Sequence, residues 1–188
     1  RDVLGSRGLG DVYKRQVQHG KKRISFAGDK NHCQSFFERY MAYKDAVEHF
    51  GLTEGLSTCA MPSGQQNYPV SLYETIRRFK TMPDAFVCAN ENIAVGLCHQ
   101  AQQEGFKIPA DFCVTGFDNF DKASYYRPRI TTVSYEREVI AEAAMDLLVQ
   151  IWGQNTTADC KTVPVQMLFQ DSCGCKPCLL YTSPSPRD

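Results

Sequence analysis

The chain has 188 residues, of which 43% are hydrophobic and 22% charged, a composition typical of a globular protein with one substantial core. Its 21 basic residues match its 21 acidic ones, so it lacks the basic excess expected of a nucleic-acid-binding segment. No run of 18 apolar residues predicts a membrane-spanning helix, and no apolar signal-peptide core lies near the start. Nine mostly scattered cysteines, several inside apolar patterns, favour a reducing, cytoplasmic setting.

The two ends of the chain show no strand or helix periodicity. Residues 1–16 and 178–188 resemble peptides that arise when adapter sequence is translated together with an insert. We expect both segments to be artefactual tails, which are left out of fold reasoning. The folded domain is then expected over residues 17–177.

The first predicted unit of that domain is a strand followed by a helix. A short apolar run over 23–27, RISFA, predicts the strand. The helix is predicted to begin at Ser35, whose side chain can cap it, and to end at Gly51. Residues at helical spacing predict one buried face, made of Phe36, Tyr40, Tyr43, Val47 and Phe50.

The middle of the chain repeats this alternation. A second strand is predicted over 57–61 and a second helix over 69–82. The next unit, AFVCANENIAVG and its continuation, predicts a buried strand over 85–89 and a helix over 91–105. Asn90 lies at the switch, where it can cap the helix and, because ligands dock at the carboxyl ends of parallel strands, can also contact a ligand.

The last part of the chain begins with a strand over 112–117 that ends at Asp118. Four strand–helix units in a row predict an α/β fold, with a parallel sheet flanked by helices on both faces. After Asp118 a longer loop breaks the alternation, and a strand over 130–134, a helix over 136–152 and a final strand over 163–169 follow. Apolar residues recur along that helix at positions i, i+1, i+4 and i+5, which predicts a face that is buried.

Six strings follow one another over residues 17–177: HGKKRISFAGD, ERYMAYKDAV, AFVCANENIAVG, GFKIPADFCVTGFDN, YYRPRITTV and FQDSC. In this order and register, they resemble the LacI/GalR family of bacterial transcription regulators. Ala42 departs from the family pattern, which usually has Gly at that position. The resemblance implies a type I periplasmic-binding-protein-like fold, in which two α/β subdomains clasp a small effector, usually a sugar or a nucleobase.

On this resemblance, the chain covers the carboxyl-terminal subdomain and the crossover elements of an incomplete first subdomain. The stripe on the 136–152 helix should pack on the part that is absent, so the chain alone should expose apolar surface and either aggregate or be poorly soluble. Operator DNA would be bound only through an amino-terminal helix-turn-helix outside the chain. Effector binding would shift the population of subdomain arrangements and so control operator binding allosterically. Family members are usually dimers, so a homodimer is expected for the intact protein.

The resemblance implies ligand contacts for Arg39, Asn90 and Asp118. Arg39 offers a rigid fork of donors, and a carboxylate such as that of Asp118 accepts from hydroxyl or ring N–H groups. Three further candidates are Ser35, one turn before Arg39, and the aromatic residues Tyr68 and Tyr135. Each candidate also has a structural interpretation, as a solvated charge, a helix cap, a loop residue or a packed ring.

Two other classes of protein would require features that differ from those of a regulator. A sugar-binding protein of an ABC transporter would share the fold, but it would need a signal peptide and an oxidising compartment. An enzyme would need a nucleophile motif around one of the four histidines, and none is recognisable. The cluster CGCKPC at 173–178 could ligate zinc but has no second pair of ligands nearby. We therefore expect no enzyme, no cofactor and no metal site.

Overall fold

A six-stranded sheet forms the centre of the structure, a computed structural model that describes residues 20–54, 81–120, 125–154 and 162–174. The strands are β1 (Arg23–Ala27), β2 (Thr53–Glu54), β3 (Ala85–Cys88), β4 (Cys113–Phe117), β5 (Thr131–Ser134) and β6 (Gln166–Leu168). They lie in the order β2-β1-β3-β4-β5-β6, and within this described sheet only β6 runs antiparallel to its neighbour. The predicted α/β fold with a mostly parallel sheet is confirmed.

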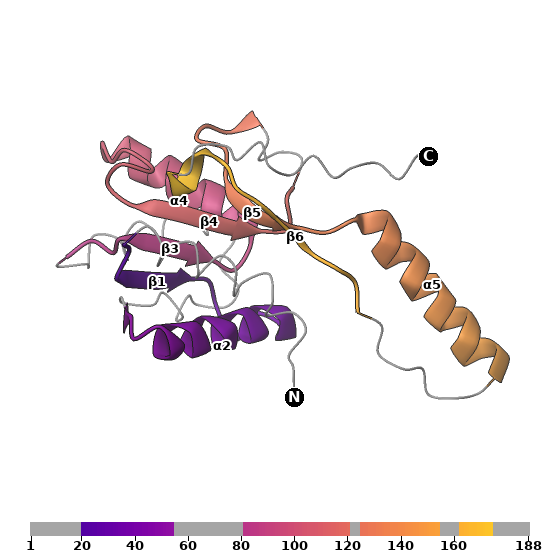
Figure 1. Cartoon of the computed structure of the whole chain (residues 1–188). Coiled ribbons are helices and arrows are strands. Elements are labelled where there is room, and N and C mark those ends of the chain that lie inside the picture. Colours follow the sequence, from indigo (N-terminus) through magenta and orange to yellow (C-terminus); the bar gives the residue numbers. More distant parts are fainter. Residues whose placement is uncertain (1–19, 55–80, 121–124, 155–161, 175–188) are drawn as a thin grey trace, which may run out of the picture.

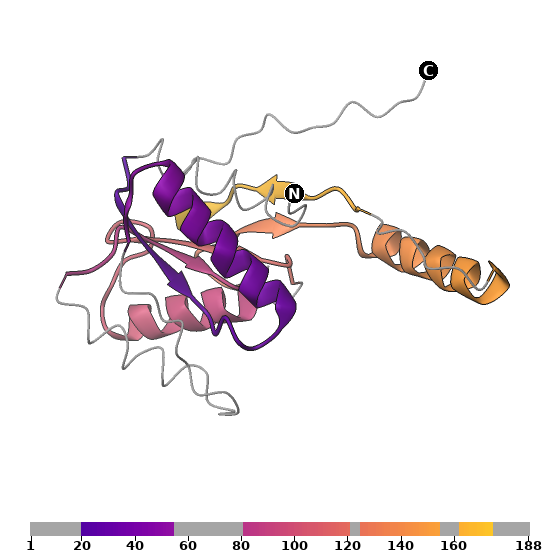
Figure 2. The ribbon, with the colours of Figure 1, turned by 90° about the horizontal axis from the view of Figure 1, so that it is seen from below.

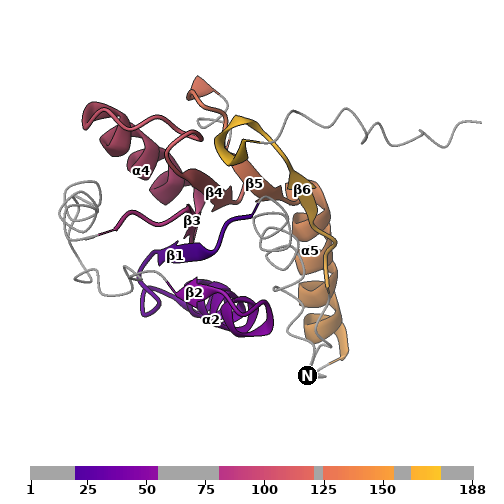
Figure 3. The same cartoon turned by 60° about the vertical axis from the view of Figure 1, so that its left-hand side comes forward.

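Helices cover the sheet on both faces. The described helices are α2 (Gln34–His49), α4 (Glu91–Gln103), α5 (Arg137–Gln154) and the short 3-10 helix η2 (Asp171–Cys173). α2 and α4 lie on opposite sides of the sheet (Figures 1 and 3). α2 buries Phe36, Tyr43 and Val47, and α4 buries Ile93 and Leu97, at the helical spacing that the sequence predicts. Because both faces are covered, the central strands are buried along their length.

Aromatic and aliphatic side chains of the central strands fill the core. Ile24, Phe26, Phe86 and Phe112 are completely buried. The rings of Phe86 and Phe112 meet edge to face, with their centroids 5.2 Å apart. Tyr43 of α2 is also fully buried, and its hydroxyl donates a hydrogen bond to the Ile24 carbonyl at 2.8 Å. That bond satisfies the one polar atom that this large side chain brings into the core.

The register of the parallel strands brings their carboxyl ends to one edge of the sheet. Ala27 at the end of β1 pairs with Cys88 at the end of β3. The next residue after β1, Gly28, has a φ of +153°, and a Cβ atom there would lie 2.5 Å from the Cβ of Ala89. Glycine is therefore required for the chain to leave β1 so close to the end of β3. The loops that follow β1, β3 and β4 are thus gathered along this edge.

α5 departs from the rest of the structure. Figures 1 and 2 show it projecting away from the sheet, beyond the end of β5. Its residues with described side chains include none that is buried, and the exposed large ones are Ile140, Met145, Leu148, Val149, Ile151 and Trp152. The apolar stripe is thus present, but no described part of the chain covers it, as expected for this chain alone. Among the described helices, none is both long and apolar enough to cross a bilayer.

Two local predictions were wrong. Ser35 does not cap α2, because the helix begins earlier: Cys33 is the N-cap residue, and Ser35 lies exposed in the first turn. The backbone turns after Asp29, whose carbonyl accepts from the N–H of His32, and this brings the chain into the helix sooner. The final strand is shorter than predicted, because β5 is only four residues long and pairs with just three residues of β6.

Three predictions fall outside the described residues: the strand over 57–61, the helix over 69–82 for nearly all its length, and the position of Tyr68. The strand β2, at the edge of the sheet beside β1, was not predicted. It contributes only two exposed residues, too few to show a periodic pattern in the sequence.

Candidate ligand-binding site

Arg39 of α2 reaches over the carboxyl ends of β3 and β4. Its Nη1 donates a hydrogen bond to the carbonyl of Ala89 at 2.6 Å, and its Nη2 lies 3.3 Å from Oδ1 of Asp118. The guanidinium carbon lies 3.7 Å from the ring centroid of Phe117, the last residue of β4. Arg39 therefore joins one helix to the ends of two strands.

The pair formed by Arg39 and Asp118 is largely screened from water. The two side chains are 14% and 16% exposed. Burial lowers the pKa of Arg39, and the negative charge of Asp118 opposes that shift. A guanidinium carries five N–H donors, so its two bonds to described residues leave donors for a further acceptor. Arg39 can therefore donate to a polar ligand while the charge of Asp118 still neutralises its own.

Asn90 follows β3 and begins α4. Its Oδ1 accepts a hydrogen bond from the backbone N–H of Ile93 at 2.9 Å, so the predicted N-cap is confirmed. Its extended backbone, with φ of −150°, is typical of a capping residue. The cap uses the oxygen of the side chain, which leaves the amide nitrogen as a donor at the same edge of the sheet as Arg39.

Asp118 follows β4 in an unusual backbone conformation. It has a φ of +99° and the next residue, Asn119, has a φ of +49°. The N–H of Asp118 still donates to the carbonyl of Val133 at 3.0 Å, which fixes the start of this turn to β5. A non-glycine residue in a sparsely populated backbone conformation destabilises the fold by about 1–3 kcal/mol, and it keeps that conformation only where surrounding contacts enforce it. Such residues cluster at functional sites, so this turn is a second indication of a site here.

The other sequence candidates differ in their placement. The ring of Tyr135 packs at 6.4 Å from that of Phe117, and burial, followed by the charge of Asp118, raises the pKa of its hydroxyl. Tyr135 therefore belongs to the same cluster. Ser35 is exposed at the start of α2, and its Oγ lies 3.2 Å from the sulfur of Cys33. Tyr68 lies outside the described residues.

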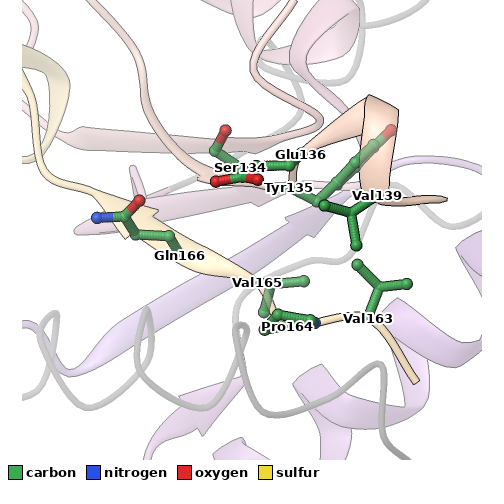
Figure 4. Close-up of a pocket in the computed structure, with 8 residues that line it drawn as sticks. All are labelled: Ser134, Tyr135, Glu136, Val139, Val163, Pro164, Val165 and Gln166. Atoms are coloured by element: carbon green, nitrogen blue, oxygen red, sulfur yellow. The ribbon is translucent and has the colours of Figure 1, made fainter. Parts of the chain in front are cut away.

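A pocket of about 240 Å³ lies beside this cluster, at the crossover between the sheet and α5. Figure 4 shows Val139 of α5 and Val163 pointing toward one another across it. Its lining is Ser134, Tyr135, Glu136, Val139, Val163, Pro164, Val165 and Gln166. Tyr135 is the residue that this pocket shares with the cluster around Arg39. The pocket itself contains neither Arg39 nor Asp118, so it is separate from the polar site.

Sequence reasoning missed two residues next to the site. Glu91 is 2% exposed, and its carboxylate accepts a hydrogen bond from the N–H of Phe120. Asn119 donates from Nδ2 to the hydroxyl of Ser134 at 3.1 Å. An acidic residue in the first turn of a helix is so common that the sequence offered no signal for Glu91. In the described part of the chain, no group of acidic, histidine or cysteine side chains could hold a metal ion.

Comparison with known proteins agrees with this arrangement. The sequence model of the periplasmic binding protein-like domain family matches residues 14–173. The lactose operon repressor of Rhizobium radiobacter is 31% identical over 99 residues, which cover 53% of this chain and 88% of that protein. The transcriptional repressor PurR of Vibrio atlanticus is 26% identical over 134 residues, or 71% of this chain. The chain spans only 40% of that repressor's length.

Solved structures show the same fold. A LacI family transcriptional regulator from Enterococcus faecium, solved with bound ribose, superimposes with a TM-score of 0.76 at 19% sequence identity. The match covers 89% of this chain and 62% of that one. The family model spans most of the chain, and the relatives are repressors of one family. The chain therefore belongs to the periplasmic binding protein-like domain family, among the effector-binding domains of LacI/GalR regulators.

Proposed function

We propose that the chain senses a small polar effector, a sugar or a nucleobase, on behalf of a bacterial transcription regulator of the LacI type. The observation that carries the proposal is the largely buried pair of Arg39 and Asp118 at the carboxyl edge of the sheet, with Asn90 beside it. Ligands of open α/β folds bind at this edge. In the family that the chain resembles, residues at these three positions contact the effector.

The chemistry of the cluster suits a ring that carries several hydroxyl or N–H groups. Arg39 supplies donors, the carboxylate of Asp118 accepts from two donors at once, and Asn90 adds an amide. The rings of Phe117 and Tyr135 supply the apolar faces against which a sugar or purine ring can lie. The Enterococcus faecium regulator of the same fold binds ribose, which supports this class of ligand. Ser35 and Tyr68 remain candidate contacts.

The regulatory mechanism follows from the two-part architecture of the family. An effector held between this domain and a second subdomain stabilises one arrangement of the two. Operator DNA, bound by a helix-turn-helix outside the chain, also prefers one arrangement, so each ligand changes the affinity of the other by the same factor. We propose a homodimer in the cytoplasm, with the sensor domain over residues 17–177 and no enzymatic activity.

The test uses the intact regulator, recovered by sequencing the source DNA on both sides of the chain's coding segment. The protein is titrated with D-ribose, D-galactose, D-glucose, adenine and hypoxanthine, and binding is measured by calorimetry. We expect one of these compounds to bind, and Arg39→Ala or Asp118→Ala to weaken binding at least tenfold, because a hydrogen bond to a charged group contributes about 1.5–3 kcal/mol.

The control is Lys44→Ala on α2, which removes an exposed ion pair with Glu54 of β2 and should leave binding unchanged. Unchanged affinity in either Arg39→Ala or Asp118→Ala would remove that residue from the site. An upstream coding segment for a signal peptide, in place of a helix-turn-helix, would overturn the regulator itself and make the chain part of a transport protein.

A further inference from the structure

The turn over residues 118–120 is held from two sides. From α4, the carboxylate of Glu91 accepts a hydrogen bond from the N–H of Phe120. From the crossover, Ser134 accepts from the side chain of Asn119 at 3.1 Å, and Arg137 donates to the backbone carbonyl of Asn119 at 3.3 Å. Hydrogen bonds from α4 and from the crossover thus hold the backbone of the 118–120 turn, whatever backbone angles its residues would adopt without them.

The backbone preference of these residues opposes the observed shape. Asp118 and Asn119 both have positive φ, and the φ of +99° at Asp118 lies outside the left-handed region near +50 to +70° that Asp and Asn tolerate best. Without outside contacts the turn would relax, and the carboxylate of Asp118 would swing away from Arg39. Strain of this kind is retained where the surrounding groups over-determine the backbone. The group that holds the far end of the turn therefore matters for the ligand site.

Glu91 is well placed for this role. It is the first residue of α4, where the helix dipole favours a negative charge, and it is 2% exposed. A buried carboxylate is costly unless it is hydrogen-bonded, and here it is bonded to the turn. In the described part of the chain, the charged groups that influence it are Asp118, at the end of β4, and Arg137, at the start of α5.

We propose that Glu91 is a positioning residue of the ligand site, whose carboxylate holds the N–H of Phe120 and so keeps Asp118 turned toward Arg39. Glu91 would act on the site through the 118–120 turn, to which its carboxylate is hydrogen-bonded. The inference rests on the proposed function, since it assigns Glu91 a task only if Asp118 serves the ligand site.

The protonation state of Glu91 gives the proposal a distinctive signature. Burial raises the pKa of Glu91 to about 7, helped by the negative charge of Asp118 and opposed by the bond to Phe120 and the charge of Arg137. An ionised carboxylate accepts a stronger hydrogen bond than a protonated one. The turn should therefore be held most firmly above pH 7 and less firmly below it.

The experiment records amide spectra of the complete 188-residue chain by NMR, with no effector present, from pH 5.5 to 8.5. Every sample also carries Leu148→Gln and Ile151→Gln, which remove exposed apolar side chains of α5 and so limit association of the chain. We expect the amide of Phe120 to titrate with a midpoint near 7, and those of Asp118 and Asn119 to follow it. Glu91→Gln keeps an acceptor but cannot ionise, so the midpoint should vanish while hydrogen exchange at Phe120 stays slow. Glu91→Ala should speed that exchange at least tenfold.

Glu138→Gln is the matched control, because it neutralises an exposed acidic residue in the first turn of α5 and should leave the titration of Phe120 intact. A midpoint that persists in Glu91→Gln would assign it to another group and overturn the proposal. So would unchanged exchange at Phe120 in Glu91→Ala. If Glu91→Ala fails to fold, the Glu91→Gln result decides. Since no effector is used, a chain that binds none of the tested compounds would contradict the proposed function without affecting these readings.

Discussion

The sheet with its two covering helices and the projecting helix α5 use apolar sequence in opposite ways. On α4, the apolar face that lies against the sheet is at most 4% exposed, as at Ile93, Leu97 and Cys98. On α5, a stripe of similar spacing is open to solvent, with Leu148 at 49% and Ile151 at 45% exposure. A periodic apolar stripe thus predicts that one face of a helix packs against another surface, but it does not show which part of the protein supplies that surface.

The proposed ligand site lies where these two regions meet. Arg39 and Asp118 belong to the covered sheet, whereas Tyr135 and Arg137 lie on the path to α5. On the proposed function, the covered sheet would stabilise the site, and the segment leading to α5 would transmit ligand binding to a second subdomain packed against that helix. Substitutions in the two regions should separate these contributions.

The largest difference is expected from the same substitution made in both regions. Leu97→Ala removes a fully buried side chain of α4 and should lower the free energy of unfolding by about 2–5 kcal/mol. Leu148→Ala, on α5, should change it by less than about 0.5 kcal/mol. Urea unfolding followed by circular dichroism measures both. Equal losses would mean that α5 is covered in solution by part of the chain or by a second copy.

The elements of the covered region follow from local sequence signals. β1 was predicted with its observed bounds, and the cap at Asn90 was predicted because a cap involves only the next three residues. The pair of Arg39 and Asp118 is different, because 79 positions separate the two. Residue chemistry alone named them as separate candidates, the family resemblance gave both a place at the effector, and only the structure brought them into contact.

The remaining differences have physical causes that sequence does not express. Ser35 was expected to cap α2 because it is a good capping residue, but the turn after Asp29 starts the helix before it. Glu91 looked like an ordinary acidic residue at a helix start, since its burial depends on a turn nearly thirty positions later. The sequence could not show what packs against the apolar face of α5, because no described segment of the chain lies against that face.

A smaller effect is expected from the charge that the covered region buries. The pKa of Glu91 is raised to about 7 from an ordinary value of 4.5, so the folded state binds a proton more tightly than the unfolded state. Its contribution to stability is therefore complete below pH 4.5 and is lost as the pH rises through 7. The shift of about 2.5 in pKa corresponds to about 3 kcal/mol, and solvent screening of the carboxylate reduces this value. Compared with Glu91→Gln, the unsubstituted chain should therefore lose about 2 kcal/mol between pH 4.5 and pH 8.

Urea unfolding at the two pH values measures this difference, because the other titrating groups are common to both chains. Glu142→Gln, on the exposed surface of α5, should show no such divergence from the unsubstituted chain. Parallel pH dependences for the unsubstituted chain and Glu91→Gln would mean that the carboxylate ionises as it does in the unfolded state.

The ion pair between Arg39 and Asp118 should contribute less to the free energy of unfolding than the ionisation of Glu91 does. A double-mutant cycle of Arg39→Met and Asp118→Asn should give a coupling of about 1 kcal/mol, because the pair is largely screened from water. The matched pair on the surface, Lys44 and Glu54, has side chains 40% and 37% exposed and should give less than about 0.5 kcal/mol. A coupling at the site no larger than that of the surface pair would show that Arg39 is held by Phe117 and Ala89 instead.

The smallest effect on folding, and a clear effect on association, is expected from the stripe on α5. Leu148→Gln combined with Ile151→Gln removes two exposed apolar side chains and keeps helix propensity, so stability should change by less than about 0.5 kcal/mol. Exposed apolar surface drives association, so the apparent mass by light scattering should fall toward that of a monomer. Glu142→Gln on the same helix should leave that mass unchanged. An unsubstituted chain that is already a monodisperse monomer would show that this face does not need cover, and the contrast between the two regions would then reflect sequence pattern alone.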